Sequence, residues 1–154
     1  NRGGIQAMAI KVLEIHHTGF RIDAEDRKMK ALEGFYTGVL GLERDPGRPT
    51  IPGIPGMWIN VGEVGQIHLF GGAQPSPAAK GPGQDPTLPH VALAVADIIE
   101  TRAELDRMGV PYWQIEGLTN PDSLQVFLND PCGNMVELHQ IDKCNCRASN
   151  RVKA

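Results

Sequence analysis

The two halves of the chain carry histidine or glutamate at matching places on segments that alternate like β-strands. His17 lies in IHHTGFRI and His68 in GQIHLF, 51 residues further on. In the second half, His90 lies in LPHVALAV and Glu137 in GNMVELHQ, 47 residues further on. Such a repeat, with one ligand-type residue at each end of each unit, predicts a metal site, because pseudo-symmetry brings all four residues to one point.

The segments between these positions predict the same order of elements twice. In the first half we expect a strand over 11–22, a helix over 23–40 and short strands over 42–45, 56–62 and 65–71. In the second half we expect a strand over 90–96, a helix over 97–110 and strands over 112–116, 123–130 and 134–140. Each half therefore has the order βαβββ.

A Gly- and Pro-rich segment, GGAQPSPAAKGPGQDPTL, separates the two units and is predicted to be a loop. We expect one domain over 1–154. It comprises a first unit over about 11–70, a linker over 71–88, a second unit over about 89–141 and a polar tail over 142–154.

The composition narrows the class of protein. The chain is 41% hydrophobic and 21% charged with a net charge of −3, and its apolar runs are too short to span a bilayer, so neither nucleic acid nor a membrane is an expected partner. Its odd set of cysteines, Cys132, Cys144 and Cys146, is not a disulfide framework and suits a reducing compartment. We therefore expect a cytoplasmic protein with free thiols.

Strand alternation indicates which side chains face the site. His17 and His16 are neighbours, and a one-residue shift of register would exchange them. Phe20 and Ile22 share the face of His16, which assigns that face to packing and favours His17 as the ligand.

The second unit supplies two clearer positions. His90 lies on the strand face opposite Val91, Leu93 and Val95, beside small residues that leave room for a bound group. Glu137 lies between apolar neighbours on an interior strand, where an unpaired carboxylate is costly. His139 shares its face and is expected to be a surface residue at a strand end.

Four stretches resemble the vicinal oxygen chelate superfamily over roughly residues 12–141: IHHTGF, FYTGVLGLE, LPHVALAV and FLNDPCGNMVELHQ. That superfamily includes glyoxalase I, methylmalonyl-CoA epimerase, extradiol ring-cleaving dioxygenases and fosfomycin-resistance thiol transferases. Cys132 stands where its final turn usually has an acid. The resemblance implies an α+β fold in which two βαβββ repeats form curved mixed sheets around a metal-binding cup.

The resemblance also implies a ligand set and a substrate type. Carried over by position, the metal ligands are His17, His68, His90 and Glu137, which hold one divalent ion among Zn, Ni, Co, Mn and Fe. Relatives differ at the position of His68, where a role beside the metal is the alternative to direct ligation. The implied partner is a small molecule that chelates the ion through two neighbouring oxygens.

Three functions follow as expectations. The first is a glyoxalase I- or epimerase-like lyase or isomerase, which removes a proton next to a carbonyl to form an enediolate, with Glu137 and His68 as catalytic residues. The second is an Fe(II) extradiol dioxygenase, in which His68 acts as an acid or base outside the ligand set. The third, a drug-binding module without chemistry, is disfavoured because such binders typically lack the ligands. Exposed sheet edges and the long linker favour a homodimer.

Overall fold

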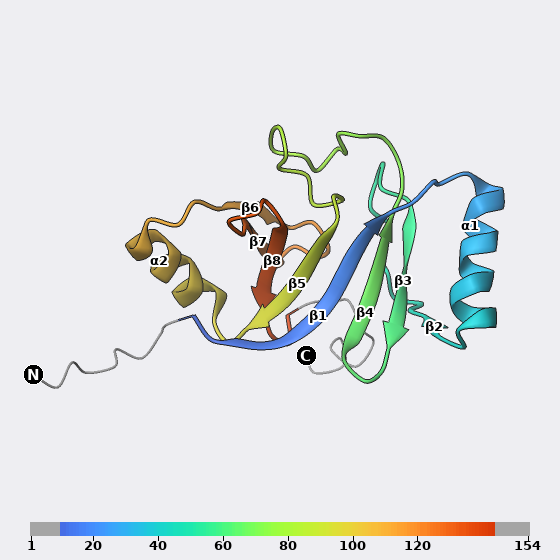
Figure 1. The fold of residues 1–154 in the computed structure, drawn as a ribbon, viewed down its shortest axis with the longest axis horizontal. Helices are drawn as coiled ribbons and strands as arrows, with labels where there is room; N and C mark the ends of the chain where they lie inside the picture. The colour runs from blue at the N-terminus through green and yellow to red at the C-terminus, as the bar shows by residue number, and fades with distance from the viewer. Residues whose placement is uncertain (1–9, 144–154) are drawn as a thin grey trace, which may run out of the picture.

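A single eight-stranded mixed sheet forms the body of the protein in a computed structural model that describes residues 10–143 (Figure 1). Its strand order is β2-β3-β4-β1-β5-β8-β7-β6. The strands are β1 (Val12–Arg21), β2 (Glu43–Arg44), β3 (Gly56–Val61), β4 (Gly65–Phe70), β5 (His90–Val95), β6 (Trp113–Glu116), β7 (Leu124–Asn129) and β8 (Met135–Gln140).

The two halves meet where β1 pairs antiparallel with β5 at the centre of the sheet. On the outer side of each central strand lies the last strand of its own half, β4 parallel to β1 and β8 parallel to β5. The halves are thus related by an approximate two-fold axis between β1 and β5. The predicted α+β class is confirmed, and the sheets of the two repeats are joined into one.

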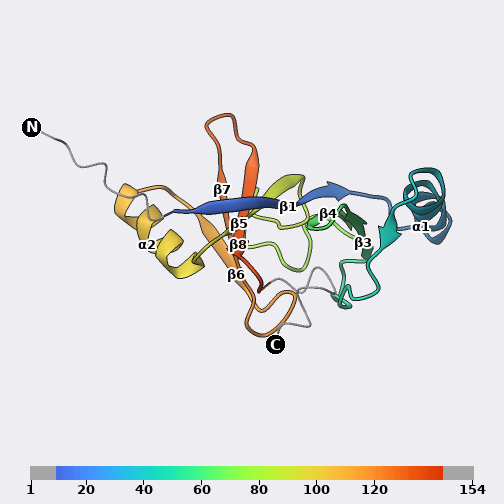
Figure 2. The ribbon, with the colours of Figure 1, turned by 90° about the horizontal axis from the view of Figure 1, so that it is seen from below.

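Two helical segments lie at opposite ends of the sheet (Figures 1 and 2). The first is α1 (Asp26–Glu33), which continues as the π-helix Gly34–Val39 and lies beside β3 and β4; the second is α2 (Ile98–Met108), beside β5 and β8. α2 lies within the predicted range 97–110. At its start the Asp97 carboxylate accepts from two backbone N–H groups, and Gly109 after its end has a φ of 67°. No helix among residues 10–143 is long and apolar enough to cross a membrane.

Each helix covers an apolar cluster on the same face of the sheet. Ile98 and Leu105 of α2 pack on Val95 and Leu138. Under α1, the side chains of Met29 and Leu32 pack on a second cluster, formed by Met57, Ile59 and Leu69. Because strand residues alternate, burying these side chains turns their neighbours, including His90 and Glu137, toward the opposite face.

A β-bulge in β1 breaks the alternation that the sequence predicts. The register against β5 shifts between Ile15 and His17, so His16 and His17 are both buried while Ile15 is 64% exposed. The expectation that His16 shares a packing face with Phe20 is therefore wrong, because the extra residue turns His16 toward the side occupied by His17. Phe20 is itself 44% exposed.

The linker is ordered around one buried carboxylate. Asp85 accepts hydrogen bonds from the backbone N–H and the hydroxyl of both Ser76 and Thr87, at 2.6–2.9 Å, and from the amide of Gln74 at 3.1 Å. Arg21 at the end of β1 donates to the carbonyl of Gly71 and to the Thr87 hydroxyl. The linker is therefore fastened to the sheet, above which it lies in Figure 1.

Cys132 is exposed in the turn before β8 and forms no disulfide. The other two cysteines of the prediction, Cys144 and Cys146, lie outside the described residues.

We expect Asp85→Asn to lower the free energy of unfolding by about 1–3 kcal/mol, since an amide replaces an acceptor oxygen among fixed donors. Burial of Asp85 opposes its ionisation, but hydrogen bonds from Ser76 and Thr87 outweigh this and lower its pKa. The loss should therefore be present above about pH 4 and shrink as the pH falls through the lowered pKa. Thermal unfolding measures it, with exposed Asp122→Asn as control; equal melting temperatures for both variants would contradict it.

Candidate metal centre

The register of the strands places the predicted residues in two neighbouring rows across the sheet. The approximate two-fold axis relates one row to the other. One row crosses the sheet as Gln66, His17, Ala92 and Glu137 on β4, β1, β5 and β8. The next row crosses the same strands as His68, Gly19, His90 and Met135. In each row a small residue lies beside a histidine, which leaves the imidazoles space to meet above the sheet.

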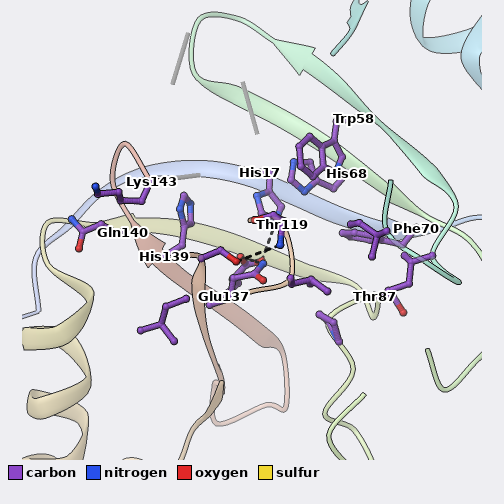
Figure 3. Close-up of a pocket in the computed structure, with 17 residues that line it drawn as sticks. His17, Trp58, His68, Phe70, Thr87, Thr119, Glu137, His139, Gln140 and Lys143 are labelled. Atoms are coloured by element: carbon purple, nitrogen blue, oxygen red, sulfur yellow. Dashed lines mark hydrogen bonds and ion pairs between the residues drawn. The ribbon is translucent and has the colours of Figure 1, made fainter. Parts of the chain in front are cut away.

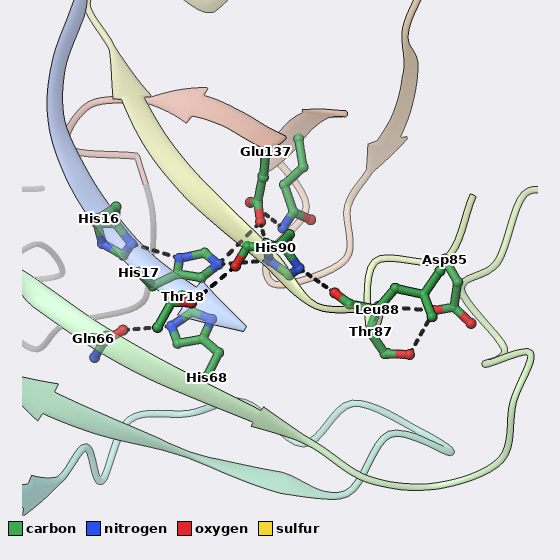
Figure 4. A network of polar contacts seen from close by, with 11 residues as sticks. His16, His17, Thr18, Gln66, His68, Asp85, Thr87, Leu88, His90 and Glu137 are labelled. Carbon is green, nitrogen blue, oxygen red and sulfur yellow. Dashed lines mark hydrogen bonds and ion pairs between the residues drawn. The ribbon is translucent and has the colours of Figure 1, made fainter. Parts of the chain in front are cut away.

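The side chains of His17, His90 and Glu137 converge on one point (Figure 4). The Nε2 atoms of the two histidines are 3.2 Å apart, and Glu137 Oε2 lies 3.2 Å from the first and 3.1 Å from the second. Ligands about 2.1 Å from an ion and at right angles to each other lie about 3.0 Å apart. The three donor atoms are thus spaced as one face of a metal coordination shell and fit a divalent ion.

The other ring nitrogens of these histidines have partners that set the tautomers. His90 Nδ1 lies 2.6 Å from the carbonyl oxygen of Leu88, which can only accept, so Nδ1 carries a proton and Nε2 is the nitrogen left to bind an ion. His17 Nδ1 lies 2.9 Å from His16 Nδ1, and in the tautomer in which His17 donates this hydrogen bond, its Nε2 carries the lone pair that binds an ion. Figure 4 shows this chain from His16 through the donors to Leu88.

Burial and mutual contact determine the charges of the cluster. Burial lowers the pKa of His17 to about 4, although the Glu137 carboxylate opposes the shift. Burial alone would raise the pKa of Glu137, but the neighbouring His17 and His90 outweigh it and hold this pKa well below its ordinary value. His90 also feels burial, yet its bond to Glu137 raises its pKa. The cluster therefore offers a carboxylate and a neutral His17, the forms that bind metal.

His68 lies beside the three converging donors and is not one of them. Its ring stacks on His17 at a centroid distance of 3.7 Å and on Trp58 at 4.5 Å. Its Nε2 lies 2.8 Å from the Oε1 atom of Gln66. The geometry brings together three of the four predicted ligands, and ligation by His68 stays a prediction.

Three polar residues around the cluster were missed by the sequence analysis. Gln125 donates from Nε2 to Glu137 Oε1 at 2.8 Å, and Gln66 donates to Asp45 Oδ2 at 2.9 Å. Gln66 could have been found, because it lies two residues before His68 on the same strand face. Gln125 and Asp45 carry no such signal, since their positions depend on the register of other strands.

His139 is buried, so the expectation of a surface histidine is wrong. Its ring packs edge-on against His16 at a centroid distance of 4.5 Å. His16 on β1 and His139 on β8 thus extend the group of imidazoles beyond the converging donors. This arrangement depends on the bulge in β1, because the bulge turns His16 toward the side of His17.

A cavity lies against the cluster. His17, His68 and Glu137 form part of its lining, and apolar side chains supply much of the rest (Figure 3). Its other walls come from the loop before β3, the linker and the loop between β6 and β7. A small molecule in this cavity would contact the converging donors directly.

The family model of the Glyoxalase/Bleomycin resistance protein/Dioxygenase superfamily matches residues 14–138. The chain belongs to this superfamily, as its resemblance predicted. A search of curated proteins finds no match.

Solved structures share the fold at low identity. The hypothetical protein BH1468 from Bacillus halodurans C-125 is 24% identical, with a TM-score of 0.61 over 82% of this chain and 93% of that one. Methylmalonyl-CoA epimerase from Mycobacterium tuberculosis is 24% identical, with a TM-score of 0.61 over 84% and 88%. A superfamily member from Vibrio splendidus 12B01 is 15% identical, with a TM-score of 0.51 over 85% and 98%. These likenesses establish the fold alone.

We expect Gly19→Ala to weaken metal binding by at least about tenfold, because displaced ligand geometry typically costs that much. A Cβ at Gly19 would lie 2.6 Å from His90 Cε1 and 3.0 Å from Phe70 Cε2, so the His90 ring must move. Gly34→Ala is the matched control, since its Cβ meets nothing within 4 Å. Competition with a chelating dye measures both affinities, and an unchanged affinity in Gly19→Ala would show that this close approach does not position His90.

Proposed function

We propose that the protein is an enzyme that uses one divalent metal ion, held by His17, His90 and Glu137, to move a proton at a carbon next to a carbonyl. Its substrate carries two neighbouring oxygens. The observation that carries the proposal is the convergence of three donor atoms within 3.1–3.2 Å of one another at the wall of a cavity. An ion bound there supplies positive charge that stabilises the negative charge developing on substrate oxygen.

His68 is the residue to which we assign the proton. Its Nε2–H donates to Gln66 Oε1, so Nδ1 carries the lone pair that can accept a proton. The orientation of the Gln66 amide is fixed, since its Nε2 donates to Asp45 and Asn60 at 2.9 and 2.7 Å. Burial, with the neighbouring imidazole of His17, holds the pKa of His68 well below its ordinary value, so the ring is neutral before the reaction.

Glu137, the other catalytic residue that the sequence predicts, has both oxygens engaged. Oε2 faces the two histidines, and Oε1 accepts from Gln125. His17 and His90 also hold the pKa of Glu137 well below its ordinary value, so it stays a carboxylate, the form that binds metal. We therefore assign Glu137 to the metal and His68 to the proton.

A ring-cleaving oxygenase that uses Fe(II) is the second candidate. The observation that favours it is the composition of the converging group, since two histidines and one carboxylate are the donor set of many non-haem Fe(II) oxygenases. A binding module without chemistry is less well supported, because simple binding does not call for converging donors in a buried site.

We expect His68→Ala to keep about one metal ion per chain and to lose at least about 100-fold in the rate of hydrogen–deuterium exchange next to the carbonyl of 2-hydroxy-1-phenylethanone. His90→Ala should lose both the metal and the exchange, because it removes a donor. Elemental analysis measures the metal, and NMR in D₂O measures the exchange.

Loss of the metal in His68→Ala would instead make His68 a fourth ligand and contradict our assignment. Oxygen uptake by the Fe(II)-loaded protein, with no exchange under any metal, would support the ring-cleaving oxygenase.

A further inference from the structure

We infer that the cavity beside the metal centre binds a molecule with an uncharged, apolar body and a hydroxyl group as one of its two metal-binding oxygens, the hydroxyl donating its proton to Gln125. The inference rests on the proposed function, and it adds the chemical class of the substrate. Two independent features of the cavity support it, the nature of its walls and an acceptor atom without a partner.

Apolar side chains form much of the cavity wall away from the metal donors. Ile51, Ile54 and Phe70 form a buried cluster on this side of the sheet, and Leu118 packs against it. These side chains come from the loop before β3, from β4 and from the loop after β6, so they surround the space above the donors. An apolar body entering it would be removed from water on several sides, which favours binding in proportion to the area buried.

The cavity offers almost no charge to a ligand. Apart from Glu137, which faces the metal donors, Lys143 is the only Asp, Glu, Lys or Arg among the described residues of the lining. Lys143 is exposed and lies on the same side as His139 and Gln140, away from Phe70 and Thr87 (Figure 3). The guanidinium of Arg21 is occupied by the linker. A charged group on the body of a ligand would lose water without gaining a partner among these residues.

Gln125 supplies the second feature. Its Nε2 donates to Glu137 Oε1 at 2.8 Å, and the reverse orientation would set two acceptor oxygens against each other. The orientation of the Gln125 amide is therefore fixed, and its oxygen Oε1 does not contact Glu137. That oxygen is buried and has no hydrogen-bond partner among the described residues, and the side chain lines the cavity. Buried acceptors are normally satisfied, and a ligand hydroxyl beside Glu137 would satisfy this one.

A calorimetric panel on the Zn²⁺-loaded and metal-free chain tests the class. The reference probe is 2-hydroxy-1-phenylethanone, which has an apolar ring, a carbonyl and a neighbouring hydroxyl. Hydroxyacetone lacks the ring, 1-phenylethanone lacks the hydroxyl, phenylglyoxylate adds a charge, and acetyl-CoA carries phosphates. We expect the reference probe to bind the loaded chain at least about tenfold more tightly than each of the other four.

The variant Gln125→Leu tests the hydroxyl. In it, the preference for 2-hydroxy-1-phenylethanone over 1-phenylethanone should shrink by about tenfold, because the acceptor is gone. Comparing the two ligands within each protein cancels any effect of the variant on folding, and elemental analysis checks that the variant keeps its Zn²⁺. An unchanged preference would overturn the role of Gln125.

The calorimetric panel on the wild-type chain tests the chemical class of the substrate, and it needs no variant. Tightest binding by acetyl-CoA or phenylglyoxylate, or equal binding of hydroxyacetone and the reference probe, would overturn the inference. If the metal-free chain still binds 2-hydroxy-1-phenylethanone more tightly than hydroxyacetone, the apolar cavity recognises the ring without the metal. A chain that binds no Zn²⁺ yet keeps that preference would refute the proposed function and leave the assignment of the cavity standing.

Discussion

The antiparallel pairing of β1 with β5 is the interaction on which the rest of the structure depends. It joins the two halves into one sheet, and its register sets His17 opposite Ala92 and Gly19 opposite His90. The small residue in each pair leaves space for the imidazole of the other, so two rings from different halves can meet 3.2 Å apart. The three converging donors thus all come from one chain, and the expected homodimer stays a prediction.

The site gathers groups that are costly to bury unless they have partners. His17 and His90 share one oxygen of Glu137, and Gln125 donates to the other. Each remaining ring nitrogen of those histidines contacts His16 or the carbonyl of Leu88. A network satisfied in this way orients its members, and orientation is what a metal ion or a proton transfer requires. The wall of the cavity is built differently, from apolar side chains such as Ile51, Ile54 and Phe70.

Much of this could be predicted from the sequence, because a repeated pattern constrains the placement of residues far apart in the chain. The order βαβββ was recognisable twice, and His17, His90 and Glu137 followed from their matching positions on alternating strands. Alternation failed at His16, because a bulge depends on the pairing of β1 with β5 and leaves no mark in the residues themselves. Gln125 was invisible for a related reason: its contact with Glu137 exists only through the register of β7 on β8.

X-ray absorption spectroscopy of the Zn²⁺-loaded chain, without substrate, tests the metal centre most directly, because it counts the imidazoles around the ion. We predict two imidazole ligands, from His17 and His90, with the remaining ligands oxygen. A third imidazole would place His68 in the ligand set and contradict its assignment to the proton. An ion without imidazole ligands would contradict the metal centre itself.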